Sequence, residues 1–269
     1  MSKADSTDLA AKETIELTFP RPSGDSLGLV LAARQSLMTT FLFYKTLGYM
    51  GRDAGQWFAE MERSNVNEPI RALEDILGGI DVSVMDEQGA WKAAGTMLEY
   101  GPLATDVHLV SLPHVEGDSL RVRLTLTKGY WRVDQAALTS IIGTAEALRI
   151  SPADVQRDGA HDPVALSMLL DSSKTLVTLP GDTYRMQFML PDSLKHAALF
   201  LESRGYYLEW IRKSWLAEED PLALAQILFD PAEALRRLAP EFSRSERLIE
   251  AQFWKSKYAP DRRTRGGMR

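Results

Sequence analysis

The stretch that most constrains the fold is Asp192 to Tyr258, which carries three of the six tryptophans of the chain and has a largely helical pattern. In its first part, apolar residues recur at steps of three, four and seven residues, the spacing of one helix face. These residues are Ala197, Leu201, Leu208, Ile211 and Trp215. The pattern predicts a first amphipathic helix that docks on the rest of the protein through Leu201, Leu208 and Trp215.

Further aromatic residues widen this apolar surface beyond what one helix contact requires. Large aromatic residues are enriched at the centres of protein interfaces, although they also dominate protein cores. The candidate contact residues are Tyr206, Tyr207, Trp210, Phe253 and Trp254. Residues 259–269 then form a basic tail with Arg262 and Arg263, which is predicted to be flexible and able to touch RNA or an acidic partner.

Four prolines predict helix starts, because each follows a side chain that can cap the first turn. The four pairs are Ser151-Pro152, Asp162-Pro163, Asp220-Pro221 and Asp230-Pro231. The last two predict short helices at 221–229 and 231–238, and the apolar spacing beyond them predicts a third helix from Arg244 to Tyr258.

Before residue 80 the sequence pattern mainly predicts helices. Thr14 to Phe19 alternates polar and apolar residues, which is typical of a strand. The apolar stretch Leu27 to Leu47 is about as long as a membrane span, but polar and charged residues interrupt it, so a buried core helix is predicted instead. Helical patterns follow at 44–61 and 70–77, and Gly78 is expected to stop the second of these helices.

From Ile80 onward the pattern changes to strands, which are predicted at 80–85, 91–97, 107–112 and 120–127. Polar residues alternate with apolar ones in these runs, so we predict an antiparallel meander with one face in water. Helical spacing returns from Val133 to Leu148. A hairpin is then predicted from residues 175–179 and 183–190, which flank a Pro-Gly-Asp turn.

Together these patterns predict an α+β fold that is helix-rich, with a central antiparallel sheet and a helical C-terminal subdomain. The predicted layout is a flexible lead at 1–13, an α+β domain at 14–190, a helical subdomain at 191–258 and the basic tail at 259–269.

Composition and charge weigh against several function classes. The chain has no cysteine, which removes disulfides, thiolate metal sites and thiol nucleophiles, and agrees with a reducing cytoplasm. Its formal net charge of -6 argues against a surface that seeks nucleic acid as a whole. The four histidines lack metal-ligand spacing and no glycine-rich phosphate loop is present, so neither metal nor cofactor is predicted.

One pair of motifs points to an enzyme. Gly24-Asp25-Ser26-Leu27 resembles the nucleophile block of the SGNH (GDSL-type) hydrolases, and Asp158-Gly159-Ala160-His161 resembles the block that supplies their other two triad members. The resemblance implies an ester hydrolase with Ser26 as nucleophile, His161 as base and Asp158 as the residue that orients the base.

The same residues also have a structural interpretation. The asparagine block of that family has no counterpart here, and Gly117-Asp118-Ser119-Leu120 repeats the same tetrapeptide in a predicted turn. Under this alternative, Asp25 or Ser26 caps the helix predicted after it, and Asp158-Gly159 forms a loop.

A second resemblance points to ligand binding. Leu47-Gly48-Tyr49-Met50-Gly51-Arg52, followed by a helix, Gly78-Gly79 and a strand pair, is similar to the opening of vinyl-reductase-like sensor domains. It covers residues 40–130 and implies that a small hydrophobic ligand is bound or that the domain mediates assembly.

Because the chain offers packing surfaces but no complete catalytic set, the sequence favours a non-catalytic cytoplasmic subunit that acts through protein-protein contacts or self-association. The ester hydrolase and the small-ligand sensor remain as alternatives.

Overall fold

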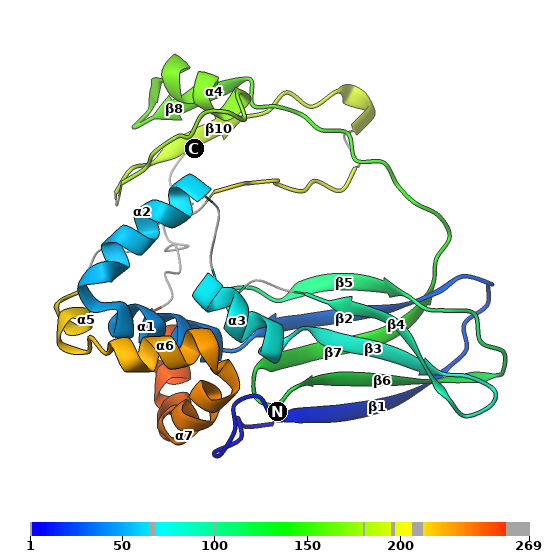
Figure 1. Cartoon of the computed structure of the whole chain (residues 1–269). Helices are drawn as coiled ribbons and strands as arrows, with labels where there is room; N and C mark the ends of the chain where they lie inside the picture. The colour runs from blue at the N-terminus through cyan, green and yellow to red at the C-terminus, as the bar shows by residue number, and fades with distance from the viewer. Residues whose placement is uncertain are drawn as a thin grey trace. The chain divides into compact units, whose positions relative to one another are not determined.

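A computed structural model describes residues 2–64, 68–98, 101–179, 181–194, 197–205 and 212–256. The chain divides into two compact units (Figure 1). The larger unit comprises residues 1–142 and 208–269, and the smaller unit comprises residues 143–207. Each unit is described by itself.

The first sheet of the larger unit has four antiparallel strands in the order β1-β6-β3-β4. These strands are β1 (Lys12–Pro20), β6 (Ser119–Thr127), β3 (Ile80–Met85) and β4 (Trp91–Met97). Alternate residues of β6 are buried, as a strand with one wet face requires. All four strands were predicted from their alternating pattern, and the structure confirms them.

The second sheet of the larger unit has three antiparallel strands in the order β5-β2-β7. They are β5 (Asp106–Ser111), β2 (Leu27–Gln35) and β7 (Trp131–Ser140). The core helix predicted at 27–47 is therefore wrong in its first half. The helix predicted from Val133 to Leu148 is wrong throughout, because β7 occupies its first part and residues 141–150 have no regular structure. Both errors have one cause: a short apolar run has no period that separates a buried strand from a helix.

Both sheets contribute to one hydrophobic core. Leu29 and Leu31 of β2 and Val122 and Leu124 of β6 are fully buried in the same cluster. Helix α7 adds Phe242 to it. The larger unit is thus held together by side chains from both sheets and from the C-terminal helices.

Four helical segments follow β2: α1 (Met38–Met50), the 3-10 helix η1 (Gly51–Asp53), α2 (Ala54–Ser64) and α3 (Glu68–Leu77). The helix predicted at 44–61 is interrupted at Gly51, whose φ is +56°. A Cβ on Gly51 would lie 2.5 Å from the side chain of Glu219. This close approach places the turn at Gly51 against the segment before α6.

The C-terminal helices of the larger unit are α5 (Lys213–Ala217), α6 (Pro221–Phe229) and α7 (Pro231–Ser256). Asp220 and Asp230 accept hydrogen bonds from first-turn backbone N–H groups, so two of the four predicted helix starts are confirmed here. The two helices predicted at 231–238 and 244–258 are instead one helix that contains Pro240.

The smaller unit contains a three-stranded antiparallel sheet in the order β10-β8-β9 and one helix. These elements are β8 (Asp154–Arg157), β9 (Ala160–His161), α4 (Pro163–Leu170) and β10 (Tyr184–Gln187). Asp162 caps α4 as predicted, but Ser151-Pro152 leads into a strand. Within the described part of 175–179, the first strand of the predicted hairpin is absent.

Two larger predictions are wrong. The fold is not helix-rich around one central sheet, because the ten strands in the described part of the chain form three separate antiparallel sheets in a mixed α/β protein. The first amphipathic helix predicted for the C-terminal run is also absent from the described residues. The short 3-10 helix η2 covers Asp192–Leu194, and residues 197–205 have no regular structure. Leu201 is 72% exposed, and only Trp215 of its predicted face is seen buried.

Candidate functional site

The three residues of the hydrolase hypothesis lie in different units. Ser26 immediately precedes strand β2, and its carbonyl oxygen accepts a hydrogen bond from the Ile141 backbone N–H at 2.8 Å. Asp158 and His161 belong to the smaller unit. Strand β2, and no helix, begins directly after Ser26. The alternative interpretation, in which Asp25 or Ser26 caps a long helix, is therefore wrong.

Within the smaller unit, His161 is paired with a different acid from the predicted one. Its ring Nδ1 makes a hydrogen bond to the carboxylate of Asp154 across the β8–β9 hairpin. That hydrogen bond lowers the pKa of Asp154. Asp158 instead occupies the hairpin turn with a φ of +52°, as its loop interpretation expected. The hydrolase with Ser26 as nucleophile, His161 as base and Asp158 as the orienting residue stays a prediction.

A second histidine lies beside an acid on an exposed loop. His114 Nε2 and Glu116 Oε1 are 2.8 Å apart, and both side chains are more than half exposed. The pair raises the pKa of His114 and lowers that of Glu116, chiefly through their hydrogen bond. No cluster of three potential metal ligands occurs among the residues that the structure describes.

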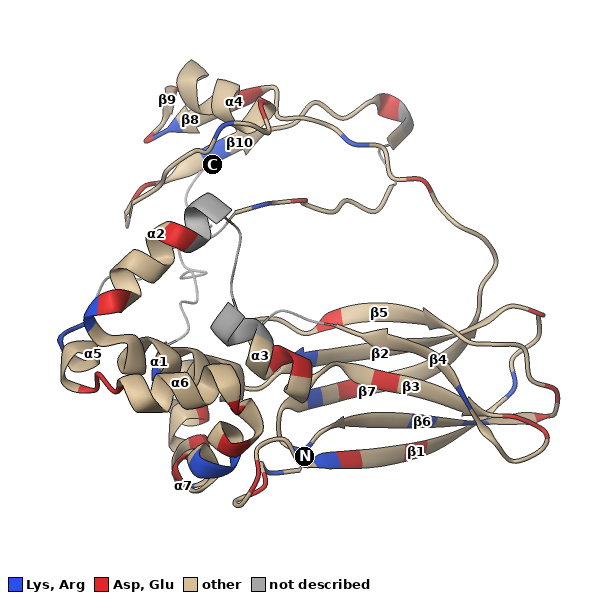
Figure 2. Ribbon diagram, in the orientation of Figure 1, with Lys and Arg blue, Asp and Glu red and all other residues tan. Residues whose placement is uncertain are grey.

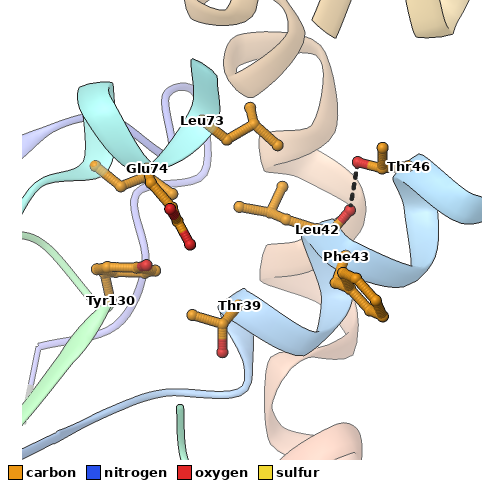
Figure 3. Close-up of a pocket in the computed structure, with 8 residues that line it drawn as sticks. Thr39, Leu42, Phe43, Thr46, Leu73, Glu74 and Tyr130 are labelled. Atoms are coloured by element: carbon orange, nitrogen blue, oxygen red, sulfur yellow. Dashed lines mark hydrogen bonds between the residues drawn. The ribbon is translucent and has the colours of Figure 1, made fainter. Parts of the chain in front are cut away.

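A small pocket of the larger unit lies between α1, α3 and the start of β7 (Figure 3). Its volume of about 50 Å³ is well below the roughly 300–1,000 Å³ of drug-sized small-molecule sites. Its lining combines apolar and polar side chains: Thr39, Leu42, Phe43, Thr46, Leu73, Glu74, Leu77 and Tyr130.

Two polar groups of this pocket, those of Glu74 and Tyr130, lie on one side of it, and Thr39 and Thr46 lie on α1 opposite them. Figure 3 shows the carboxylate of Glu74 directed toward Tyr130. The Tyr130 hydroxyl accepts a hydrogen bond from Gln35 at 3.1 Å. Burial raises the pKa of Tyr130, and the charge of Glu74 raises it further. This phenol therefore stays protonated and can act as a hydrogen-bond donor at the pocket wall.

Of the predicted contact residues, the structure describes only two. Phe253 and Trp254 lie near the end of α7, where the Arg34 guanidinium is 4.9 Å from the centre of the Trp254 ring and Trp254 donates to Glu250. Trp254 is 38% exposed, so it is partly engaged within the larger unit. Tyr206, Tyr207 and Trp210, together with Arg262 and Arg263 of the basic tail, lie outside the described residues.

The smaller unit has many exposed apolar side chains. Most of the large apolar side chains of this unit are exposed, several of them in the two runs 186–190 and 199–201. We call these exposed residues the apolar surface of the smaller unit: Leu148, Val164, Leu169, Leu170, Val177, Leu179, Met186, Phe188, Met189, Leu190, Leu199, Phe200 and Leu201.

The interior of the smaller unit is correspondingly small. In the described part of this unit, only Val155 and Ala165 are buried apolar residues. Ion pairs such as Arg157 with Asp182, at 2.8 Å, lie at its surface and contribute little to stability. A chain segment of this size needs most of its apolar surface covered to fold stably. The unit therefore exposes the residues that would normally form its core.

Two apolar runs in the sequence indicate this surface. Phe188 to Leu190 and Leu199 to Leu201 are runs of consecutive apolar residues, without the alternation by which a strand such as the one predicted at 183–190 would bury one face. The second run is predicted to lie on a helix face because Leu201 and Leu208 are seven residues apart, the spacing of two helical turns.

Charge does not define a site in the described chain. Figure 2 shows basic and acidic residues interspersed along the ribbon of both units, without a large region of one sign. No helix of the described part is long and apolar enough to cross a membrane. Comparisons with protein-family models, with curated proteins and with solved structures gave no match.

Proposed function

We propose that this protein is a non-catalytic binding or assembly subunit that acts in the cytoplasm and holds a partner protein on the apolar surface of its smaller unit. The observation that carries the proposal is the contrast between that extensive apolar surface and the two buried apolar residues beneath it. Single exposed leucines need no explanation, but a concentration of them marks an interaction surface.

The segment 197–205 is the part of this surface most suited to a partner. Phe200 is 93% exposed, and Leu199 and Leu201 on either side of it are also largely exposed. Aromatic side chains that fill a pocket on the partner are frequent hot spots of binding energy. A segment without regular structure can also adapt its backbone to the surface that it meets.

The test is a binding measurement with a defined partner. The tagged full-length chain is purified from its native cells, the co-purifying protein is identified and produced separately, and the affinity is measured by calorimetry. We expect Phe200→Asp to weaken binding by about 30-fold or more, since burying a hot-spot aromatic contributes about 2 kcal/mol or more.

Leu222→Asp is the matched control for this measurement. Leu222 is a large apolar residue on α6 of the larger unit, and its side chain is 84% exposed. It should leave the affinity unchanged if the smaller unit carries the site. Equal losses in both variants, or the absence of any stoichiometric partner, would contradict the proposal.

A second candidate function rests on the pocket beside Tyr130. Its apolar lining with a carboxylate and a protonated phenol on one side suits a hydrophobic ligand of only a few non-hydrogen atoms that carries one polar group. Native mass spectrometry of the freshly purified protein tests this sensor function. A stoichiometric small molecule that is lost in a Leu42→Trp variant would support it, and a bare chain in every preparation would remove it.

A further inference from the structure

Strand β1 forms one edge of the four-stranded sheet and pairs only with β6. Figure 1 shows it as the outermost strand of that sheet, along its whole length. It has nine residues, which is long for an edge strand, and its only proline is the last residue, Pro20. An edge of this kind is able to accept a further strand.

The hydrogen bonds at the two ends of the ladder show which backbone groups of β1 point outward. The Ala11 carbonyl accepts from the Lys128 N–H at 2.8 Å, and the Arg21 N–H donates to the Asp118 carbonyl at 2.9 Å. Bonded and non-bonded positions alternate along an antiparallel pair, so the odd-numbered residues between them bond to β6.

The even-numbered residues Thr14, Glu16 and Thr18 therefore direct their N–H and carbonyl groups away from the sheet. Within the described chain these backbone groups make no hydrogen bond. Their side chains lie on the exposed face, where Arg121 and Arg123 hold the Glu16 carboxylate at 2.9 and 2.6 Å. The charge of Glu16 is thus already balanced within the sheet.

The opposite face of β1 is apolar and incompletely covered. Ile15, Leu17 and Phe19 pack against the core but remain half-buried, whereas Val122 and Leu124 of the neighbouring strand are fully buried. A strand added beyond β1 would cover these three side chains and satisfy the free backbone groups together.

We propose that β1 of a second copy of this chain adds to this edge, antiparallel and centred on Leu17, to form one continuous sheet across two subunits. In that register Leu17 faces Leu17 of the second copy, and Ile15 faces Phe19. The outward backbone groups of Glu16 then bond to those of Thr18. The apolar residues of the two strands are matched on one face and the polar residues on the other.

Charge complementarity favours this register and therefore a second copy. Glu13, at one end of β1, lies opposite Arg21, just beyond the other end, and the pairing occurs twice because of the two-fold symmetry. Shifting the register by two residues in one direction places Glu16 opposite Glu16 and Glu13 opposite Phe19, which like-charge repulsion and burial of a charge disfavour. Shifting it by two residues in the other direction places Arg21 opposite Ile15 and Glu13 opposite Ser23, which removes the charge pair. This dimer concerns the larger unit and is independent of the partner site proposed above.

The first experiment measures the mass of the full-length chain in solution by sedimentation over a range of concentrations. The native chain should form dimers, and Thr18→Pro should raise the dimer dissociation constant about tenfold or more, because it removes an outward N–H in both copies. The substitution leaves the β1–β6 hydrogen bonds intact, and an edge strand tolerates proline at such a position. Thr18→Val, which keeps the N–H, should dimerise like the native chain.

The second experiment does not depend on a proline variant that folds. Because the chain lacks cysteine, a single Leu17→Cys substitution should cross-link into a covalent dimer on mild oxidation, since paired non-bonded residues lie close enough for a disulfide. Ile15→Cys and Phe19→Cys should cross-link only when the two variants are mixed. A chain that stays monomeric at every concentration would overturn the proposal, whether its β1 edge stays open or accepts another protein. A dimer whose dissociation constant Thr18→Pro leaves unchanged would also overturn it.

Discussion

A buried ion pair, Arg132 with Glu246, joins strand β7 to helix α7. The two charged groups are 2.9 Å apart, and both residues are less than a tenth exposed. Arg132 also donates to the Gly129 carbonyl oxygen at 2.9 Å, so its remaining donors are partly satisfied. Removal of Glu246 leaves the buried Arg132 charge facing the more distant Glu250 carboxylate, at 3.7 Å, and this weaker compensation costs more than the intact pair contributes.

We therefore expect Glu246→Ala to lower the free energy of unfolding by about 3 kcal/mol. The double variant Arg132→Met with Glu246→Leu should recover most of that loss, because it removes both charges and keeps the volume. Urea unfolding of the three proteins measures both effects. A double variant as unstable as the single one would show that the pair itself stabilises the fold.

A titration near the N-terminus makes stability depend on pH. Asp5 accepts hydrogen bonds from the backbone N–H and hydroxyl of Thr7, and these bonds lower its pKa to about 2 in the folded chain. Since the folded pKa is depressed, the stabilisation is complete above the ordinary value near 3.8 and is lost as the pH falls toward about 2. Asp5→Asn should flatten this part of the stability curve, as measured by thermal unfolding between pH 5 and pH 2. An unchanged slope would contradict the assignment.

At the scale of secondary-structure elements, the β3–β4 hairpin depends on a close approach at Gly79. A Cβ at this position would lie 2.3 Å from the Met97 carbonyl oxygen, which is backbone and cannot rotate away. We expect Gly79→Ala to destabilise the protein by about 1–3 kcal/mol, the usual range for overpacking. Gly143→Ala is the control, because nothing lies within 4 Å of its Cβ. Chemical denaturation that gives equal stabilities for the two variants would argue against this approach.

Elements were predicted well where local chemistry decides them. Asp162, Asp220 and Asp230 each cap a helix as their Asp-Pro pairs indicate, because a capping side chain and a proline act within one turn. Leu27 to Gln35 was predicted as helix because an apolar run without alternation suits either structure. It became a strand between β5 and β7, where long-range hydrogen bonds replace the local ones of a helix.

At the scale of the whole molecule, the two units differ in how much apolar surface they bury. The larger unit shares an extensive core between its sheets and helices, whereas the smaller unit buries only Val155 and Ala165 among its described apolar residues. We expect the backbone amides of β8 and β10 to exchange hydrogen at least about a hundredfold faster than those of β2 and β6.

Binding of the partner should slow exchange in the smaller unit alone, because the partner would cover its apolar surface. Hydrogen-exchange mass spectrometry of the free chain and of the complex measures both effects. Uniform exchange across the free chain would show that the smaller unit is stable by itself and would weaken the proposed function.

Features that act over a few residues could be predicted from the sequence. Alternation predicts the strands from Ile80 to Thr127, capping residues predict three helices, and composition excludes disulfides and thiol chemistry. The division of the strands among three sheets, the exposure of Leu201 and the open edge at β1 became visible in the folded structure. These properties depend on pairing and burial between residues far apart in the chain, and the hydrophobic effect that drives them has no direction in sequence. The candidate site was not predicted, because the sequence pattern of an apolar residue is the same whether that residue is buried in the core or contacts a partner.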